Sequence, residues 1–214
     1  MPISGTTRML GLIGTPVAHS KSPAMYNYCF QKFGLDWAYL AFDVPQEKAA
    51  EAVAAIRTLN LRGANVTMPC KNAVIPYLDE LSPAAKAIQA VNTIVNENGR
   101  LIGHNTDGCG YTQNLRRSGI EVAGKKIVLL GGGGAASAIA IQAALEGAAE
   151  IAVFNLKDAF WPRVEKGLAA IAQAAPACRI SLHDLEDRKA LKAAVGRCDI
   201  LSNATRVGMA PYED

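Results

Sequence analysis

The sequence predicts an α/β protein with two domains, the second of which contains a doubly wound parallel sheet. Residues 127–137, IVLLGGGGAAS, carry the clearest signal, because four apolar residues lead into four glycines and then into a helix start. From there, strand-like and helix-like segments alternate, which is typical of parallel strands joined by right-handed crossovers. A break in the pattern at residues 120–124 predicts one domain at residues 1–122 and another at residues 123–214.

The N-terminal domain is also predicted to be α/β. Pro23 at a first helical position, with Ser22 as the cap, starts a helix that ends near Gly34. Asn98 and Gly99 between two short strands predict a hairpin. The expected strands cover residues 8–14, 39–44, 62–67, 93–96 and 101–105, and the expected helices cover residues 23–34, 46–59, 72–78 and 107–118.

The C-terminal domain follows a regular strand and helix alternation. Its expected strands cover residues 125–130, 150–155, 178–182 and 199–202. Three helices are expected between them: one at residues 135–145, a second that ends near residue 174, and a third at residues 188–195. In a sheet of order 3-2-1-4-5-6, the chain would reach its fourth strand at residues 199–202.

Composition excludes several classes of function. The net charge of +3, without a basic run, argues against nucleic acid as the main partner. The five cysteines are scattered, with no CxxC pair and no histidine at ligand spacing, so we expect free thiols in a reducing compartment and no metal site. The absence of a secretory pattern and of a long apolar run predicts a cytoplasmic protein with no membrane partner.

The glycine-rich turn fits a dinucleotide fingerprint. Gly131, Gly133 and Ala136 occupy the G-x-G-x-x-G/A positions. Gly131 permits the tight turn, Gly133 lets the backbone approach a pyrophosphate, and Ala136 keeps helix and strand close. The N–H groups and dipole at the helix start then favour phosphate. A glycine-rich turn in any α/β domain is the alternative explanation of the pattern alone.

Polar residues of the N-terminal domain gather where strands end, which is where ligands bind in α/β sheets. Each has a simpler structural explanation by itself: Ser22 and Asp107 as helix caps, Lys71 as a solvated surface residue. Four separate clusters at strand ends favour a site. The clusters are Ser20 and Ser22; Asn65, Thr67 and Lys71; Asn92 and Thr93; and Asn105, Thr106 and Asp107.

Taken in order, these motifs resemble the shikimate dehydrogenase family. The resemblance covers nearly the whole chain, which makes it far more specific than the glycine turn. It implies an N-terminal domain that binds a polyhydroxylated cyclohexane carboxylate and a Rossmann-like domain that binds a nicotinamide cofactor. The matching segments are HSKSP, NVTMPCK, AVNT, GHNTDGCG, GGGGAA and NATRVGM, the last of which includes Thr205, Gly208 and Met209.

The resemblance also implies roles for individual residues. Ser20 and Ser22 would hold the substrate carboxylate, and Thr67, Asn92 and Asp107 would hold ring hydroxyls. Lys71, paired with Asp107, would be the general acid/base, since oxidation of a secondary alcohol releases a proton as well as a hydride. The implied cofactor site comprises Gly131, Gly132, Gly133, Gly134, Ala135, Asn155, Lys157, Asp158, Thr205 and Arg206.

The end of the second C-terminal strand bears on the choice of cofactor. The NADP-preferring branch carries an arginine-rich N-R-T segment there, whereas this chain reads Asn155-Leu156-Lys157-Asp158. A carboxylate accepts hydrogen bonds from a ribose diol and repels a 2′-phosphate. The segment is thus similar to the quinate/shikimate dehydrogenase branch and implies NAD, with NADP as an alternative because of Lys157. Asp158 can also cap the next helix, and that role is compatible with either cofactor.

The chain departs from the family at its end. The family continues past the NATxxGM segment with further strands and a G-x-x-M-L-x-x-Q segment, whereas this chain stops after Pro211-Tyr212-Glu213-Asp214. We therefore expect an incomplete second sheet, poor solubility and little activity from these residues alone, and a natural product several tens of residues longer.

The resulting functional prediction is an NAD(P)-dependent oxidoreductase that interconverts quinate or shikimate and the 3-dehydro acids, in aromatic amino-acid biosynthesis or quinate use. One alternative is an NADP-specific shikimate dehydrogenase. Another is a dinucleotide-binding module without turnover, which Lys71, Asn92 and Asp107 argue against because a pure binder needs no proton relay. The expected partner is a small molecule, and a homodimer is left open.

Overall fold

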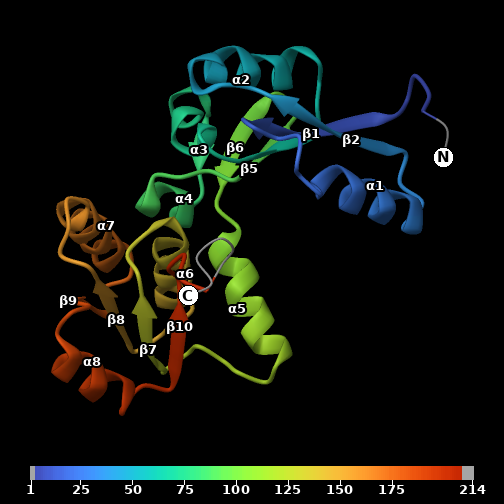
Figure 1. Ribbon diagram of the computed structural model, residues 1–214. Helices are drawn as coiled ribbons and strands as arrows, with labels where there is room; N and C mark the ends of the chain where they lie inside the picture. The colour runs from blue at the N-terminus through green and yellow to red at the C-terminus, as the bar shows by residue number, and fades with distance from the viewer. Residues whose placement is uncertain (1–2, 209–214) are drawn as a thin grey trace. The chain divides into compact units, whose positions relative to one another are not determined.

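The computed structural model describes residues 3–208 (Figure 1). By its internal contacts the chain divides into two compact units, between Asn105 and Thr106. The helix that begins at Asp107 belongs to the second unit, because it packs on a helix of that unit. The predicted boundary between functional domains at residues 122 and 123 stays a prediction.

The first unit is built on a six-stranded sheet with the order β2-β1-β3-β5-β6-β4. Strand β1 pairs in parallel with both β2 and β3, whereas β5 pairs antiparallel with β3 and β6. The α/β class expected from the sequence is confirmed. The strands are β1 Arg8–Gly14, β2 Trp37–Asp43, β3 Gly63–Val66, β4 Glu80–Leu81, β5 Thr93–Glu97 and β6 Arg100–His104.

Helices cover both faces of this sheet, with α1 on one face and α2 on the other (Figure 1). Adjacent β1 residues point to opposite faces, so Leu12 packs with Phe30 of α1 while Ile13 joins a core that includes Val53 and Ile56 of α2. The helical segments are α1 Ser22–Lys32, η1 Gln46–Lys48, α2 Ala49–Thr58, α3 Cys70–Ala73, η2 Ile75–Tyr77 and α4 Pro83–Ile88.

Several local predictions for this unit need correction. Helix α1 begins at Ser22 itself, so Ser22 is not its cap; the Oγ of Ser20 instead accepts a hydrogen bond from the Ser22 N–H at 3.2 Å. The helix expected at residues 72–78 is two short pieces, α3 and η2. Strand β4 and helix α4 had not been predicted. The hairpin at Asn98-Gly99 is confirmed, with φ values of 54° and 95° that suit a type I′ turn.

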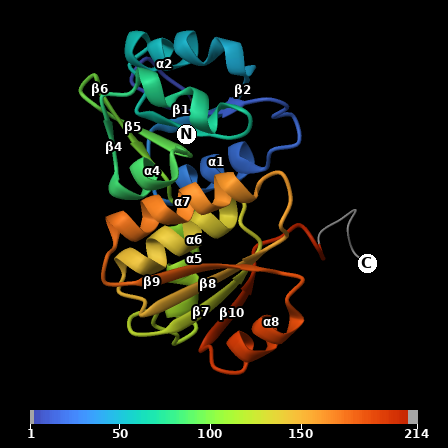
Figure 2. The ribbon, with the colours of Figure 1, turned by 90° about the vertical axis from the view of Figure 1, so that its left-hand side faces the viewer.

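The second unit holds a four-stranded sheet, all parallel, with the order β10-β7-β8-β9. This is the 4-1-2-3 part of a doubly wound sheet, so the predicted Rossmann-like topology is confirmed. Helices α6 and α7 lie on one face and α8 on the other (Figure 2). The strands are β7 Lys126–Leu130, β8 Glu150–Asn155, β9 Arg179–Asp184 and β10 Ile200–Asn203, and the helices are α5 Asp107–Arg117, α6 Gly134–Leu145, α7 Trp161–Ala174 and α8 Arg188–Val195.

Helix α5 contacts α6 so closely that only glycine fits between them. A Cβ at Gly108 would lie 2.0 Å from the carbonyl oxygen of Ala138. One turn further along α5, the Thr112 hydroxyl donates to the carboxylate of Glu146, which follows α6, at 2.9 Å. This packing explains why α5 belongs to the second unit. Across residues 3–208, no helix is both long and apolar enough to cross a membrane.

Candidate active site

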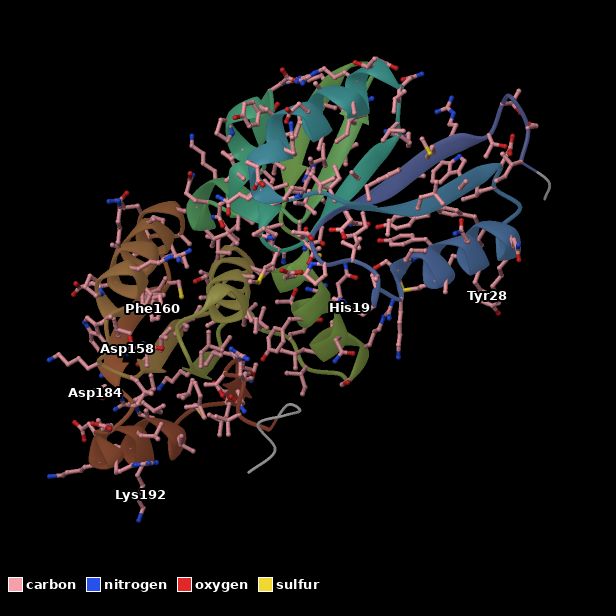
Figure 3. All side chains as sticks on the ribbon, turned by 45° about the horizontal axis from the view of Figure 1, so that its top comes forward. His19, Tyr28, Asp158, Phe160, Asp184 and Lys192 are labelled. Atoms are coloured by element: carbon pink, nitrogen blue, oxygen red, sulfur yellow. The ribbon has the colours of Figure 1, made fainter. Side chains whose placement is uncertain are left out.

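The serine-containing loop of the first unit leaves β1 and leads into α1. Ser20 lies in this loop and Ser22 is the first residue of α1; both are partly buried, and Ser20 follows exposed His19, which Figure 3 labels. At the start of the loop, Gly14 has φ 152°, and a Cβ there would lie 2.4 Å from Thr67 Cγ2. The ends of β1 and β3 are therefore in contact, which brings the serine loop and the Thr67 segment to one edge of the sheet.

Backbone hydrogen bonds bring Thr67, Lys71 and Asn92 together at that edge. The Thr67 N–H donates to the carbonyl of Ile13 at 2.8 Å, and its own carbonyl accepts from Cys70 at 2.9 Å. The residue before Asn92 donates its N–H to the Lys71 carbonyl at 2.9 Å. Three of the residues predicted to bind substrate thus lie on neighbouring segments of one unit, although they span 25 positions of the sequence, from 67 to 92.

Asn92 has a fixed main chain and a largely buried side chain. Its N–H donates to the His104 carbonyl at 2.9 Å, and its carbonyl accepts from the Val66 N–H at 2.8 Å. Its side-chain Oδ1 accepts a hydrogen bond from the Thr93 hydroxyl at 3.0 Å. Only 9% of Asn92 is exposed, so its side chain lies almost wholly inside the first unit.

Tyr39 is connected to this edge of the sheet, and the sequence had not singled it out. Its hydroxyl donates to Asn65 Oδ1 at 2.8 Å, although its Cα lies on the outermost strand β2. Burial raises the pKa of Tyr39 far above its usual 10.0, so the phenol stays protonated and can act as a donor. A tyrosine among apolar strand residues is typical of core, so no local signal reveals this role.

The glycine turn of the second unit has the geometry of a phosphate site. Gly131 has φ 93°, and a Cβ there would lie 2.9 Å from Thr205 Cγ2. At Gly133 and Gly134, by contrast, a Cβ would meet no described heavy atom within 4 Å. No side chain in the described part of the chain caps the α6 N-terminus. This open helix start can bind an anion through its N–H groups, and the residues present therefore fit a dinucleotide pyrophosphate.

Asn155 and Asp158 shape the loop that follows β8. Asn155 Oδ1 accepts from the Gly132 N–H at 2.9 Å, which joins this loop to the glycine turn. The Asp158 carboxylate accepts from the Phe160 N–H at 2.9 Å, and both residues are exposed in the loop before α7 (Figure 3). Asp158 therefore stabilises the loop that leads into α7. Its carboxylate also has further acceptor sites, which a ribose diol could use. Lys157 Nζ lies 5.9 Å from the Trp161 ring centroid.

The loop after β10 completes this edge of the second unit. The Thr205 N–H and hydroxyl both donate to Asn203 Oδ1, at 3.0 and 2.6 Å. This holds Thr205 against the glycine turn, with exposed Arg206 next in the chain. Met209 of the NATRVGM segment lies outside the described residues.

Asp107 is the first residue of α5, and it does not cap that helix. The cap position is Thr106, without a side-chain cap hydrogen bond, and Asp107 occupies the first turn, where a negative charge favours the helix. Lys71 belongs to the first unit and Asp107 to the second. Their predicted pairing stays a prediction. Within residues 3–208, no three His, Cys, Asp or Glu side chains are grouped so as to hold a metal ion.

Comparison with known proteins gives consistent matches along the chain. The family model for the shikimate dehydrogenase substrate binding domain matches residues 12–94. The shikimate dehydrogenase (NADP(+)) of Listeria monocytogenes serovar 1/2a is 48% identical over 211 residues, which cover 99% of this chain and 72% of that protein. The Streptococcus uberis enzyme of the same name is 48% identical over 214 residues, with the same coverage of both chains.

Solved structures agree with these sequence matches. A 1.45 Å crystal structure of shikimate 5-dehydrogenase from Listeria monocytogenes in complex with shikimate and NAD has a TM-score of 0.96 and 47% identity, and covers 100% of this chain and 73% of that one. Quinate dehydrogenase from Corynebacterium glutamicum in complex with NAD has a TM-score of 0.83 and 27% identity, and covers 96% of this chain and 73% of that one.

Proposed function

Because the chain belongs to the shikimate dehydrogenase family, we propose that it interconverts shikimate and 3-dehydroshikimate, with a nicotinamide dinucleotide as the hydride carrier. The observation that carries this proposal is the match of the whole chain, at 47% identity, to an enzyme whose crystal structure holds shikimate and NAD. The clustering of Thr67, Lys71 and Asn92 at one sheet edge supports it independently.

In this proposal the first unit supplies most of the substrate contacts. Ser20, in the loop between β1 and α1, and Ser22, the first residue of α1, bind the carboxylate through their hydroxyl groups, as neutral donors can. Thr67, directly after β3, and Asn92, directly before β5, bind ring hydroxyls. Asp107 at the start of α5 is proposed as a third hydroxyl ligand.

Lys71 is proposed to move the proton that the reaction requires. A bound nicotinamide accepts or returns a hydride at the carbinol carbon. The hydroxyl proton must leave at the same time, and the Lys71 amine takes it as the alcohol becomes a ketone; in reverse, the ammonium returns it. A general acid/base of this kind contributes about a hundred- to ten-thousand-fold in rate.

The cofactor is proposed to bind the second unit, with NAD used at least as well as NADP. The open α6 N-terminus accommodates the pyrophosphate, and exposed Asp158 favours a ribose diol over a 2′-phosphate. The Listeria monocytogenes relative is named for NADP(+), while the crystal structure from that organism holds NAD. Lys157 beside Asp158 keeps NADP as a usable second cofactor.

Quinate is proposed as a second substrate, because the segment after β8 resembles the quinate/shikimate branch and quinate dehydrogenase shares the fold. A turnover assay with shikimate and quinate against NAD and NADP tests all of these assignments. We expect turnover of shikimate with both cofactors. Absence of turnover with every pair would refute the proposal and favour a dinucleotide-binding module. A homodimer and a cytoplasmic location stay predictions.

A further inference from the structure

We propose that Tyr39, Asn65 and Thr93 form a hydrogen-bond chain that fixes the orientation of the Asn92 amide, so that Asn92 presents N–H donors to a substrate hydroxyl. We call Tyr39, Asn65, Thr93 and Asn92 the amide chain. The inference rests on the proposed function, since it assigns Asn92 to the substrate. It assigns Tyr39, Asn65 and Thr93 a positioning role that acts through the Asn92 side chain.

Every hydrogen bond in the amide chain donates in the same direction. The Tyr39 hydroxyl donates to Asn65 Oδ1 at 2.8 Å, and Asn65 Nδ2 donates to Thr93 Oγ1 at 3.3 Å. The Thr93 hydroxyl, which has a single hydrogen, donates to Asn92 Oδ1 at 3.0 Å. The oxygen of the Asn92 amide is thereby held toward Thr93, and its Nδ2 hydrogens lie on the opposite side of the amide.

The direction of the chain is set at Tyr39. The oxygen and nitrogen of a side-chain amide are nearly equal in size. Packing therefore does not determine which way the Asn65 and Asn92 amides face, and their hydrogen bonds must do so. Turning Asn65 over would aim its Nδ2 at Tyr39, and the buried phenol hydrogen would lose its acceptor. Tyr39 is 1% exposed, and the structure shows no other acceptor for its hydroxyl among the described residues. Its protonated state therefore orients the whole chain.

The sheet explains why a tyrosine is needed at position 39. Tyr39 lies opposite Leu10 of β1, and Asn65 of β3 lies opposite Leu12 of β1, so the tyrosine must reach across an intervening strand. Two strand spacings come to about 10 Å, which a tyrosine with its hydrogen bond can cover. Tyr26 stacks on the ring with 4.4 Å between centroids and holds it along this path.

The fixed main chain of Asn92 makes the amide orientation decisive. Backbone hydrogen bonds to Val66 and His104 hold the main chain of Asn92 in place, so the orientation of its amide decides which group it offers to a ligand. With Nδ2 turned toward the ligand, a ring hydroxyl accepts from Asn92 and keeps its own hydrogen for another acceptor. With the amide turned over, the same hydroxyl would meet an acceptor and lose one of its hydrogen bonds.

Variants that change only hydroxyl groups test this inference. Tyr39→Phe and Thr93→Val should each raise the shikimate KM by about three- to tenfold with little change in kcat, because a lost hydrogen bond weakens ground-state and transition-state binding alike. Thr93→Ser keeps the hydroxyl and should stay near the wild-type KM. Tyr28→Phe, an exposed tyrosine of the same unit labelled in Figure 3, is the matched control and should change nothing.

A double-mutant cycle separates positioning from general destabilisation. In an Asn92→Ala background, Tyr39→Phe should have no further effect on kcat/KM, because there is no amide left to orient. An equal loss in both backgrounds, or an unchanged KM in Tyr39→Phe, would overturn the inference while wild-type turnover still supported the proposed function. Absence of turnover in the wild type would instead refute the proposed function and the inference together.

Discussion

The side-chain amide of Asn27 hydrogen-bonds to both backbone groups of Tyr39. Its Oδ1 accepts from the Tyr39 N–H at 2.9 Å, and its Nδ2 donates to the Tyr39 carbonyl at 2.9 Å. These are the bonds that a neighbouring strand would make, so Asn27 occupies the open edge of β2. That protection matters because β2 is a seven-residue edge strand, WAYLAFD, with a charge only at Asp43.

We predict that Asn27→Ala destabilises the protein and exposes this edge. The partly buried N–H and C=O groups of Tyr39 would lose their partners. Each unsatisfied group lowers the free energy of unfolding by about 1–3 kcal/mol. The uncovered strand would also favour self-association. Urea unfolding and light scattering measure the two effects. Gln31→Ala, an exposed amide on the same helix, is the control, and equal behaviour of the two variants would show that Asn27 does not protect the edge.

A second prediction compares two glycines of α5. Gly108→Ala places a Cβ 2.0 Å from the Ala138 carbonyl oxygen, so α5 and α6 must move apart. Overpacking of this kind destabilises by about 1–3 kcal/mol or more. Gly110→Ala meets no described atom within 4 Å and should stabilise the helix by about 0.5–1 kcal/mol. Thermal unfolding checks the opposite signs, and equal shifts would contradict the helix contact.

The elements with strong periodic signals could be predicted from the sequence, and β8 and α8 have the predicted bounds. The glycine turn and the alternation after it also determined the sheet order, because right-handed crossovers leave few topologies. Strand β4 was missed because it has two residues, too few for a period, and its position depends on pairing with β6. The end of the first unit depends on the α5 and α6 contact, which involves residues 30 positions apart.

The candidate site was predictable only where polar residues follow strands. Lys71 and Asn92 could be singled out because each belongs to a polar cluster that lies next to a strand. Tyr39 does not stand out, since a buried tyrosine in a strand is indistinguishable from ordinary core until the position of Asn65 is known. Side-chain hydrogen bonds across strands follow from register, which periodicity alone does not give.

The stability of the first unit should fall at acid pH because of Asp79. The Leu101 N–H, and after it the Arg57 guanidinium, lower the pKa of Asp79 below its usual 3.8. A lowered folded-state pKa means that this stabilisation is present above about pH 4 and is lost as pH falls through the folded value. Unfolding followed from pH 6 to pH 2 should show a shallower acid decline in Asp79→Asn. Arg57→Met should flatten the decline less, since the Leu101 N–H has the larger effect.

Lys71→Met should abolish most turnover while shikimate still binds. The variant keeps the length of the side chain and removes the proton-accepting amine, so kcat should fall about a hundred- to ten-thousand-fold with a modest change in KM. Lys86→Met, an exposed lysine of the same unit, serves as the control. Near-normal kcat in Lys71→Met would remove Lys71 from the proposed mechanism.

The last prediction separates the two roles of Asp158 by charge. Asp158→Asn keeps an oxygen that can accept from the Phe160 N–H, so the loop before α7 should survive while the negative charge is lost. We expect kcat/KM with NADP to rise by about tenfold, because a nearby carboxylate no longer opposes the 2′-phosphate, and kcat/KM with NAD to fall by a few-fold. Asp158→Ala removes the acceptor as well, so it should show the same cofactor shift together with a lower melting temperature. If the wild type strongly prefers NADP, or if Asp158→Asn leaves the NAD to NADP ratio unchanged, Asp158 acts only in the loop.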